Sequence, residues 1–206
     1  MKKPQFLTGT EAAKLISDNS TVATIGMTLV SASETILKAI EQRFLEEGSP
    51  HGLTLVHSCG QSDRDRGIQH FAHEGMLKRI IGGHWGLQPK MMDLIANNKI
   101  LAYCIPQGQF AQLYRSMAGG EPGKITKVGL GTFIDPRLDG GKMNEITKSA
   151  PDIVDVVTID GEEYMRYKPI PLDYVIIRGT YVDEMGNLTT DEEAMQLEVF
   201  SAVMAC

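Results

Sequence analysis

The sequence predicts an α/β protein with an open, mostly parallel sheet flanked by helices. Short apolar or β-branched runs alternate with segments of helical apolar spacing through most of the chain. Such alternation is typical of units in which helices cover a parallel sheet. With 206 residues the chain can bury a full core, so a single domain spanning residues 1–206 is expected.

The expected strands are short runs rich in Val, Ile, Leu and Thr. Asp160-Gly161 between two of them indicates a hairpin turn. The runs are Thr21–Gly26, Leu53–His57, Arg79–Gly83, Ile100–Ile105, the run that opens at Ile125, Ile153–Ile159, Glu163–Tyr167 and Leu172–Tyr181.

Helices are expected between these strands. Thr8-x-x-Glu11 and Ser31-x-x-Glu34 are capping-box patterns, and each precedes apolar residues at helical spacing. Residues 61–67 are charged and are expected to form a loop. The expected helices follow Thr8, run from the Ser31 box to Gly48, and cover Pro89–Asn98, Phe110–Met117 and Asp191–Ala205.

Composition and charge narrow the class of protein. A formal net charge of −6 argues against non-specific nucleic-acid binding. No apolar run is long enough to span a membrane, and the N-terminal residues lack the apolar segment of a signal peptide. Cys59, Cys104 and Cys206 form an odd, sparse set, which indicates reduced thiols in the cytoplasm.

The most distinctive stretch is residues 125–145, where a short β-type run is followed by a glycine-rich segment. Gly129, Gly131 and Thr132 lie close together in it. Glycines let main-chain amides approach a ligand, and a threonine hydroxyl can fix a polar atom. Arg137 in the same stretch can meet an anionic group, as can the lysine at 142. The third glycine of a nucleotide-binding fingerprint is missing, and a plain surface turn is the alternative interpretation.

Three other polar or glycine-containing segments directly follow expected strands. They are residues 26–28, 82–86 and 107–108. The carboxyl ends of parallel strands share one edge of an open α/β sheet, and ligands bind at that edge. We therefore expect Gly26 and Gln107 to line a ligand site together with the glycine-rich loop.

A metal site and a hydrolase site are the alternatives that other residues raise. His70 and His73 are spaced one helical turn apart but match no zinc signature, so no metal is expected. The Ser-Cys-Gly sequence at 58–60 lacks the first glycine of a nucleophile elbow. Cys59 and Cys104 remain possible thiol nucleophiles, although cysteine in a strand-like run is usually a small buried hydrophobe.

Four stretches together resemble the N-terminal, α-type half of the family I coenzyme A transferases, most closely the propionate and acetate CoA-transferases. They occur in the family's order and span most of the chain, and GLGTFIDPR followed by GGK-x-N is the most specific. The stretches are FAHEGMLKRIIGGHWG (71–86), AYCIPQG (102–108), KVGLGTFIDPR with GGKMNEITK (127–148) and IRGTYVDEMGN (177–187).

The resemblance implies the CoA-transferase (NagB/RpiA-like) fold and a ping-pong reaction. A glutamate of a β-type half attacks an acyl-CoA, and the resulting glutamyl-CoA thioester passes CoA to a short-chain carboxylic acid. Main-chain amides stabilise the oxyanion. The family's glutamate lies in an E-x-G-x-x-G context that this chain lacks, so no catalytic residue is expected in it. Coenzyme A would be a substrate, and no prosthetic group is expected.

The resemblance also implies that residues 1–206 are one subunit, or an N-terminal fragment, of a two-half enzyme that forms a homo-oligomer. The alternative is a non-catalytic domain on the same scaffold that binds acyl-CoA or a sugar phosphate. Leu29 favours this alternative, because it stands where the family has a glycine near the reacting carbonyl. The residues expected to bind the substrates are Gly26, Gln107, Gly129, Gly131 and Thr132.

Overall fold

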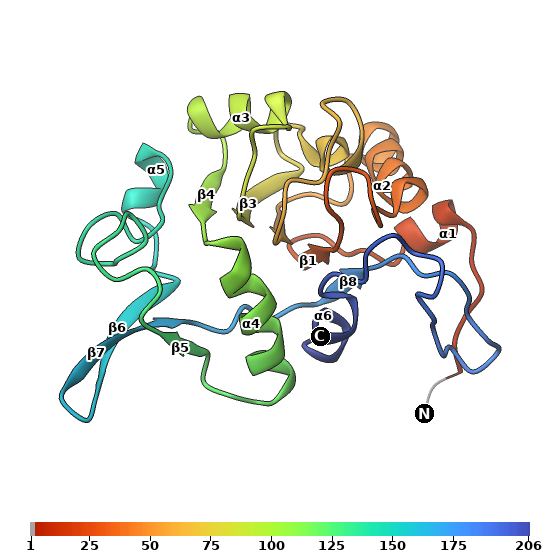
Figure 1. The fold of residues 1–206 in the computed structure, drawn as a ribbon. Helices are drawn as coiled ribbons and strands as arrows, with labels where there is room; N and C mark the ends of the chain where they lie inside the picture. Colours follow the sequence, from red (N-terminus) through yellow and green to blue (C-terminus); the bar gives the residue numbers. More distant parts are fainter. Residues whose placement is uncertain (1–2) are drawn as a thin grey trace.

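The computed structural model describes residues 3–206 and contains a five-stranded sheet (Figure 1). All four pairings in this sheet are parallel, as the sequence predicts. The strands, in spatial order, are β4 (Leu101–Cys104), β3 (Leu77–Gly82), β2 (Leu53–His57), β1 (Thr21–Thr24) and β8 (Tyr174–Ile176).

The register brings the carboxyl ends of four strands to one edge of this sheet. Thr24 of β1 lies opposite His57 of β2, which lies opposite Gly82 of β3, and Gly82 lies opposite Cys104 of β4. The loops that leave these strands therefore start side by side.

Helices cover both faces of the sheet, which agrees with the predicted architecture (Figure 1). The short helix α5 (Glu145–Lys148) lies next to β4. One face carries α1 (Gly9–Ala13), α2 (Glu34–Glu47), the 3₁₀ helix η1 (Gly67–Phe71) and α3 (Pro89–Ala96), and the other carries α4 (Gln107–Ala118) and α6 (Val199–Met204).

Neighbouring residues of the central strands point to opposite faces, and both are apolar. Leu55 and Ile80 belong to the core beneath α2 and α3, whereas Val56 and Ile81 belong to the core beneath α4 and α6. Burial on both faces is characteristic of parallel sheets. This double burial explains why the strands can be recognised in the sequence as continuous apolar runs.

A second, antiparallel sheet has the order β5-β7-β6 (Lys124–Thr126, Glu162–Tyr167 and Val154–Ile159). The turn between β6 and β7 has positive φ at Asp160 and Gly161, 52° and 81°, which suits a tight hairpin. The predicted hairpin is therefore confirmed. Alternation of elements alone gave no sign that these strands would form a separate sheet.

Two predicted elements near the C-terminus are shorter in the structure. The strand predicted at Leu172–Tyr181 is limited to β8, because the chain then folds back on itself and Thr180 N donates to Thr189 O at 2.8 Å. The helix predicted at Asp191–Ala205 is limited to α6, and Leu197 just before it has a positive φ of 47° that a helix cannot continue through.

One capping box is confirmed and the other is wrong. Glu11 N donates to Thr8 Oγ1 at 3.2 Å, and Thr8 N donates to Glu11 Oε2 at 2.8 Å. Helix α2 instead has Ser33 as its N-cap, without a side-chain hydrogen bond. Ser31 Oγ donates to Met195 O at 2.9 Å, and Glu34 accepts a hydrogen bond from Gly67 N at 2.9 Å. Both residues of the second box are thus used for contacts with distant segments.

The predicted loop at 61–67 leads directly into η1, which the sequence analysis missed. The imidazole of His70, in η1, lies against Glu41 and Glu34 of α2. None of the helices within residues 3–206 is both long and apolar enough to cross a membrane.

Candidate functional site

The candidate site lies at the carboxyl edge of the parallel sheet, where loops leave β1 to β4. Thr28 N donates to Gly60 O at 2.7 Å, which joins the loops after β1 and β2. Ile105 N donates to Gly82 O at 3.0 Å, which joins the ends of β4 and β3. The strand ends and their loops therefore form one connected edge.

Glycines let these loops pack closely on one another. A Cβ atom on Gly83 would collide with the main-chain oxygen of Ser58, and one on Gly82 would collide with the ring of His57. Gly26 is buried, and a Cβ there would lie 3.2 Å from the backbone of Ala32. Glycine is therefore needed at this edge because the backbones of neighbouring loops lie too close together for a side chain.

Leu29 lies in the tight turn that follows Gly26. Met27 N donates to Val30 O at 3.0 Å, and Val30 N donates to Met27 O at 2.8 Å. Thr28 has a positive φ of 53°, whereas Leu29 does not have a positive φ. The turn therefore forms without a glycine at position 29.

Gln107 is exposed and is the first residue of α4, directly after the end of β4 and Pro106. The main-chain N–H groups in the first turn of a helix have no partner within the helix and carry a partial positive charge. No acidic side chain occupies the first turn of α4. This terminus and the Gln107 amide therefore suit a carboxylate or another anion at the sheet edge.

The glycine-rich loop after β5 reaches the outer side of β4. Cys104 N donates to Gly141 O at 2.8 Å, and Met143 N donates to Ala102 O at 3.0 Å. A Cβ on Gly141, which has a φ of 72°, would lie 2.7 Å from Cys104 O. The later part of the loop is thereby fixed beside the end of β4.

The predicted loop residues lie in an internally bonded turn. Gly131 and Thr132 are exposed, and Thr132 Oγ1 donates to Gly129 O at 2.8 Å. Gly131 N donates to Asp135 Oδ2 at 2.9 Å. Gly26 and Gln107 thus lie at the carboxyl edge of the parallel sheet, whereas Gly129, Gly131 and Thr132 follow the second sheet.

The two cations expected to meet an anionic ligand are paired within the loop region, which corrects that expectation. Arg137 donates to Asp135 through Nε at 2.9 Å and to Glu163 at 2.8 Å. Its guanidinium holds the pKa of the buried Asp135 carboxyl far below the usual range. Lys142 Nζ lies 2.7 Å from Asp152. Their charges therefore serve to fix the loop.

A family model described as coenzyme A transferase matches residues 7–205. The chain belongs to the coenzyme A transferase family. It is 43% identical over 190 residues to the caffeate CoA-transferase of Acetobacterium woodii, covering 92% of this chain and 36% of that protein. It is 37% identical over 201 residues to the acetate CoA-transferase YdiF of Escherichia coli K12, covering 97% of this chain and 38% of that protein.

Solved structures of coenzyme A transferases have the same fold. An acyl-CoA transferase of E. coli O157:H7, in a thioester complex with CoA, superimposes with a TM-score of 0.93 at 36% identity, covering 99% of this chain and 43% of that chain. Glutaconate CoA-transferase of Acidaminococcus fermentans gives a TM-score of 0.73 at 15% identity, covering 97% of this chain and 63% of that chain. At this identity the similarity shows a shared fold and nothing more. The family resemblance and the predicted fold are confirmed. The chain spans about four-tenths of the length of these two curated relatives.

A buried histidine fixes the loop after β2. Trp85 Nε1 donates to His57 Nε2 at 3.0 Å, and His57 Nδ1 lies 2.8 Å from Cys59 O. One ring nitrogen is therefore an acceptor and the other a donor, which defines a neutral imidazole. Burial lowers the pKa of His57 to about 4. With both nitrogens occupied, His57 serves as a structural link and not as a base.

The sequence analysis missed a polar group formed by the residue after β2, a residue of α4 and the N-cap residue of α6. Ser58 Oγ donates to Glu198 Oε2 at 3.0 Å, next to the buried Tyr114 hydroxyl, which has no hydrogen-bond partner within residues 3–206. Burial and the Glu198 carboxylate raise the pKa of Tyr114 well above its usual value. Only the position of Ser58 after a strand could have signalled this group, since Glu198 lies far away in sequence.

The alternative chemistries find no support at this edge. Burial raises the pKa of the Cys59 thiol, as does the nearby Glu198 carboxylate, and burial also raises the pKa of Cys104. Both thiols are thus held in the protonated, weakly nucleophilic form. His70 and His73 pair with carboxylates of α2, and residues 3–206 contain no cluster of three His, Cys, Asp or Glu side chains suited to a metal.

Proposed function

We propose that residues 1–206 form the α-type half of an enzyme that moves CoA between an acyl-CoA and a short-chain carboxylic acid. Family membership over residues 7–205 is the observation that carries the proposal. The chain covers only 36% of the caffeate CoA-transferase but 82% of the acetate CoA-transferase subunit alpha of E. coli K12, to which it is 24% identical over 203 residues. A chain of this length is thus close to one half of a transferase.

The reaction proceeds through a glutamyl-CoA intermediate on the β-type half. A glutamate carboxylate of that half attacks the acyl-CoA thioester and releases CoA thiolate, which attacks the glutamyl carbonyl of the resulting anhydride, so that the donor acid leaves and glutamyl-CoA forms. The acceptor carboxylate then attacks glutamyl-CoA, and the released thiolate attacks the acceptor carbonyl of the second anhydride, which gives the new acyl-CoA and frees the glutamate. No glutamate of residues 1–206 lies in the E-x-G-x-x-G context. This half therefore supplies binding groups and not the attacking carboxylate. Coenzyme A is a substrate of the reaction.

The carboxylic acid or acyl group binds at the carboxyl edge of the parallel sheet. The N-terminus of α4 and the Gln107 amide attract and orient a carboxylate there. Gly26 has no side chain, so the loop after β1 leaves space for the substrate at this edge. The loop containing Gly129, Gly131 and Thr132 forms an outer wall of the cleft. Orientation of the acid against the attacking group is the contribution of this half to the rate.

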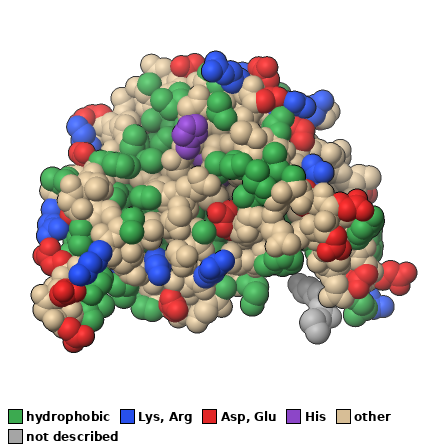
Figure 2. Space-filling model, in the orientation of Figure 1, with side chains coloured by type: hydrophobic (Ala, Val, Ile, Leu, Met, Phe, Trp, Pro, Cys, Tyr) green, Lys and Arg blue, Asp and Glu red, His purple; other side chains and the backbone are tan. Residues whose placement is uncertain are grey.

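The β-type half packs against apolar side chains around the C-terminal helix. Phe200, Val203 and Met204 of α6 expose about half or more of their side chains. Apolar side chains lie between scattered charges on the face that Figure 2 shows. Exposed apolar groups of this kind favour a protein interface. The complete enzyme assembles further into a homo-oligomer.

A reconstitution assay with two variants tests the proposal. Propionyl-CoA and acetate are supplied to residues 1–206 alone and to residues 1–206 with the β-type half, and acetyl-CoA is measured. Activity is expected only with both halves, and Gln107→Ala should raise the KM for acetate about tenfold while Gln112→Ala, on the same helix, leaves it unchanged. Binding of acyl-CoA without turnover by the reconstituted protein would instead support the non-catalytic alternative.

A further inference from the structure

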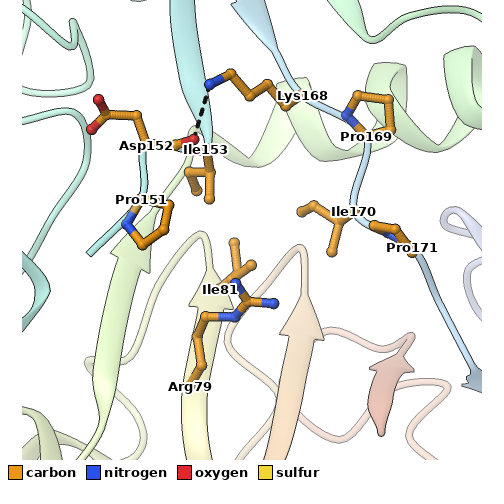
Figure 3. A pocket seen from close by; sticks show the side chains of 9 residues that line it. All are labelled: Arg79, Ile81, Pro151, Asp152, Ile153, Lys168, Pro169, Ile170 and Pro171. Carbon is orange, nitrogen blue, oxygen red and sulfur yellow. Dashed lines mark hydrogen bonds between the residues drawn. The ribbon is translucent and has the colours of Figure 1, made fainter.

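A pocket of about 190 Å³ lies between the parallel sheet and the segments that enter and leave the second sheet (Figure 3). Its floor is formed by β3, and its walls come from the chain before β6 and after β7. It shares no lining residue with the candidate transferase site, because neither Gly26 and Gln107 nor the loop containing Gly129, Gly131 and Thr132 lines it. The lining residues are Arg79, Ile81, residues 151–153 and residues 168–171.

Arg79 is the unusual residue of this pocket. It is only partly exposed, its Nε atom is shielded from solvent, and that atom has no hydrogen-bond partner within residues 3–206. Figure 3 shows its guanidinium directed into the pocket, beside Ile81. An arginine side chain remains charged at any physiological pH, and a shielded donor without an acceptor is unfavourable. Among residues 3–206, therefore, no carboxylate pairs with this guanidinium.

The remaining walls combine one more cation with apolar groups. Lys168 Nζ donates to the main-chain oxygen of Asp152 at 3.1 Å and lies 3.7 Å from the Asp155 carboxylate. The Asp152 carboxylate points away from the pocket in Figure 3 and lies 2.7 Å from Lys142. Pro169, Ile170 and two further prolines form most of the rest of the lining. The interior thus has a cationic group at each of two opposite sides, Arg79 and Lys168, with apolar groups between them.

We propose that this pocket binds a small organic carboxylate, with its carboxylate on Arg79 and its aliphatic part against the prolines and Ile170. A planar guanidinium matches a carboxylate with two parallel hydrogen bonds. Lys168 adds attraction, but it already donates to the backbone. A single guanidinium with two parallel N–H donors, next to apolar walls, suits a monoanion with an aliphatic tail better than a phosphate dianion. The site does not depend on CoA transfer, and it would let the concentration of free acid be sensed away from the reaction centre.

Crystals of the complete protein that carries residues 1–206, soaked with 3-bromopropionate, test the proposal. The anomalous signal of bromine is expected in the pocket, with the carboxylate on Arg79, whatever is found at the carboxyl edge of the sheet. This readout separates the proposal from the proposed function, because it locates the ligand without measuring turnover. A pocket that stays empty at saturating probe, or that a side chain of another chain segment fills, would overturn it.

A titration with matched variants completes the test. Arg79→Gln should weaken binding of 3-bromopropionate at this pocket about tenfold or more, whereas Lys78→Gln, the neighbouring exposed residue of β3, should not. Arg79→Lys keeps the charge and gives a folded comparison if the glutamine variant does not fold, and it should bind with intermediate affinity. Equal affinity in all variants, or displacement of the probe by equimolar inorganic phosphate, would contradict a carboxylate site on Arg79.

Discussion

Single residues at the carboxyl edge act mainly by fixing the loops. His57 is the clearest case, since its two ring nitrogens are held by Trp85 and the Cys59 carbonyl. Sequence patterns placed His57 at the end of a strand but could not reveal its partners. The same holds for Ser58 and Glu198, whose contact depends on how the last helix returns to the sheet.

The neutral state of His57 makes stability depend on pH. Its pKa of about 4 in the folded protein is below the usual 6.5, so the unfolded chain binds more protons between these values. This contribution is complete above pH 6.5 and is lost as the pH falls towards 4, by about 3 kcal/mol in the free energy of unfolding. Urea unfolding between pH 7 and 4.5 should show a shallower decline for His57→Gln than for wild type. The exposed His51, changed to Gln, is the control, and an unchanged slope in His57→Gln would refute the assignment.

Two glycines of the same turn should respond very differently to alanine. Gly131 has a φ of 70° and open space around a Cβ position, so Gly131→Ala should cost about 1 kcal/mol from backbone strain alone. A Cβ on Gly129, with a φ of 107°, would lie 2.6 Å from Tyr167 Oη. Gly129→Ala should therefore cost about 3 kcal/mol. Chemical denaturation of both variants measures these costs, and equal values would show that the Tyr167 contact is unimportant.

Caps and turns held by local interactions were predicted well, whereas side-chain contacts between distant segments were not. The Thr8 box caps its helix because both partners lie within one turn. Ser31 had the same pattern, but the segment near Met195 takes its hydroxyl. The glycine-rich loop was recognised from its composition, yet its cations were assigned to a ligand because Asp135 and Asp152 could not be placed next to them from sequence.

The ion pair of Asp135 should hold this loop in place. The carboxylate accepts hydrogen bonds from Gly131 N and from the guanidinium and backbone of Arg137. Asp135→Asn removes the charge at nearly constant volume and should lower the free energy of unfolding by about 2 kcal/mol. Amide exchange over residues 129–141 should also become faster. Asp139→Asn, an exposed change in the same loop, should do neither, and identical behaviour of the two variants would exclude the anchoring role.

At the scale of the whole molecule, the fold was predictable because each central strand is buried on both faces. Alternating apolar runs and helices defined the parallel sheet, and its carboxyl edge followed from that topology. Gln107 at the start of α4 was placed correctly at this edge. Gly129, Gly131 and Thr132 instead follow β5 of the second, antiparallel sheet. The substrate roles of these residues stay predictions.

Mapping the covalent intermediate tests most directly whether the attacking carboxylate belongs to the β-type half and residues 1–206 supply only binding groups. The reconstituted enzyme is mixed with propionyl-CoA without an acceptor acid, digested, and the CoA-modified peptide is identified by mass spectrometry. We expect a glutamyl-CoA thioester on the β-type half and unmodified peptides throughout residues 1–206, including those with Cys59 and Cys104. A stable CoA adduct on any carboxylate or thiol of residues 1–206 that forms at the rate of turnover would contradict it.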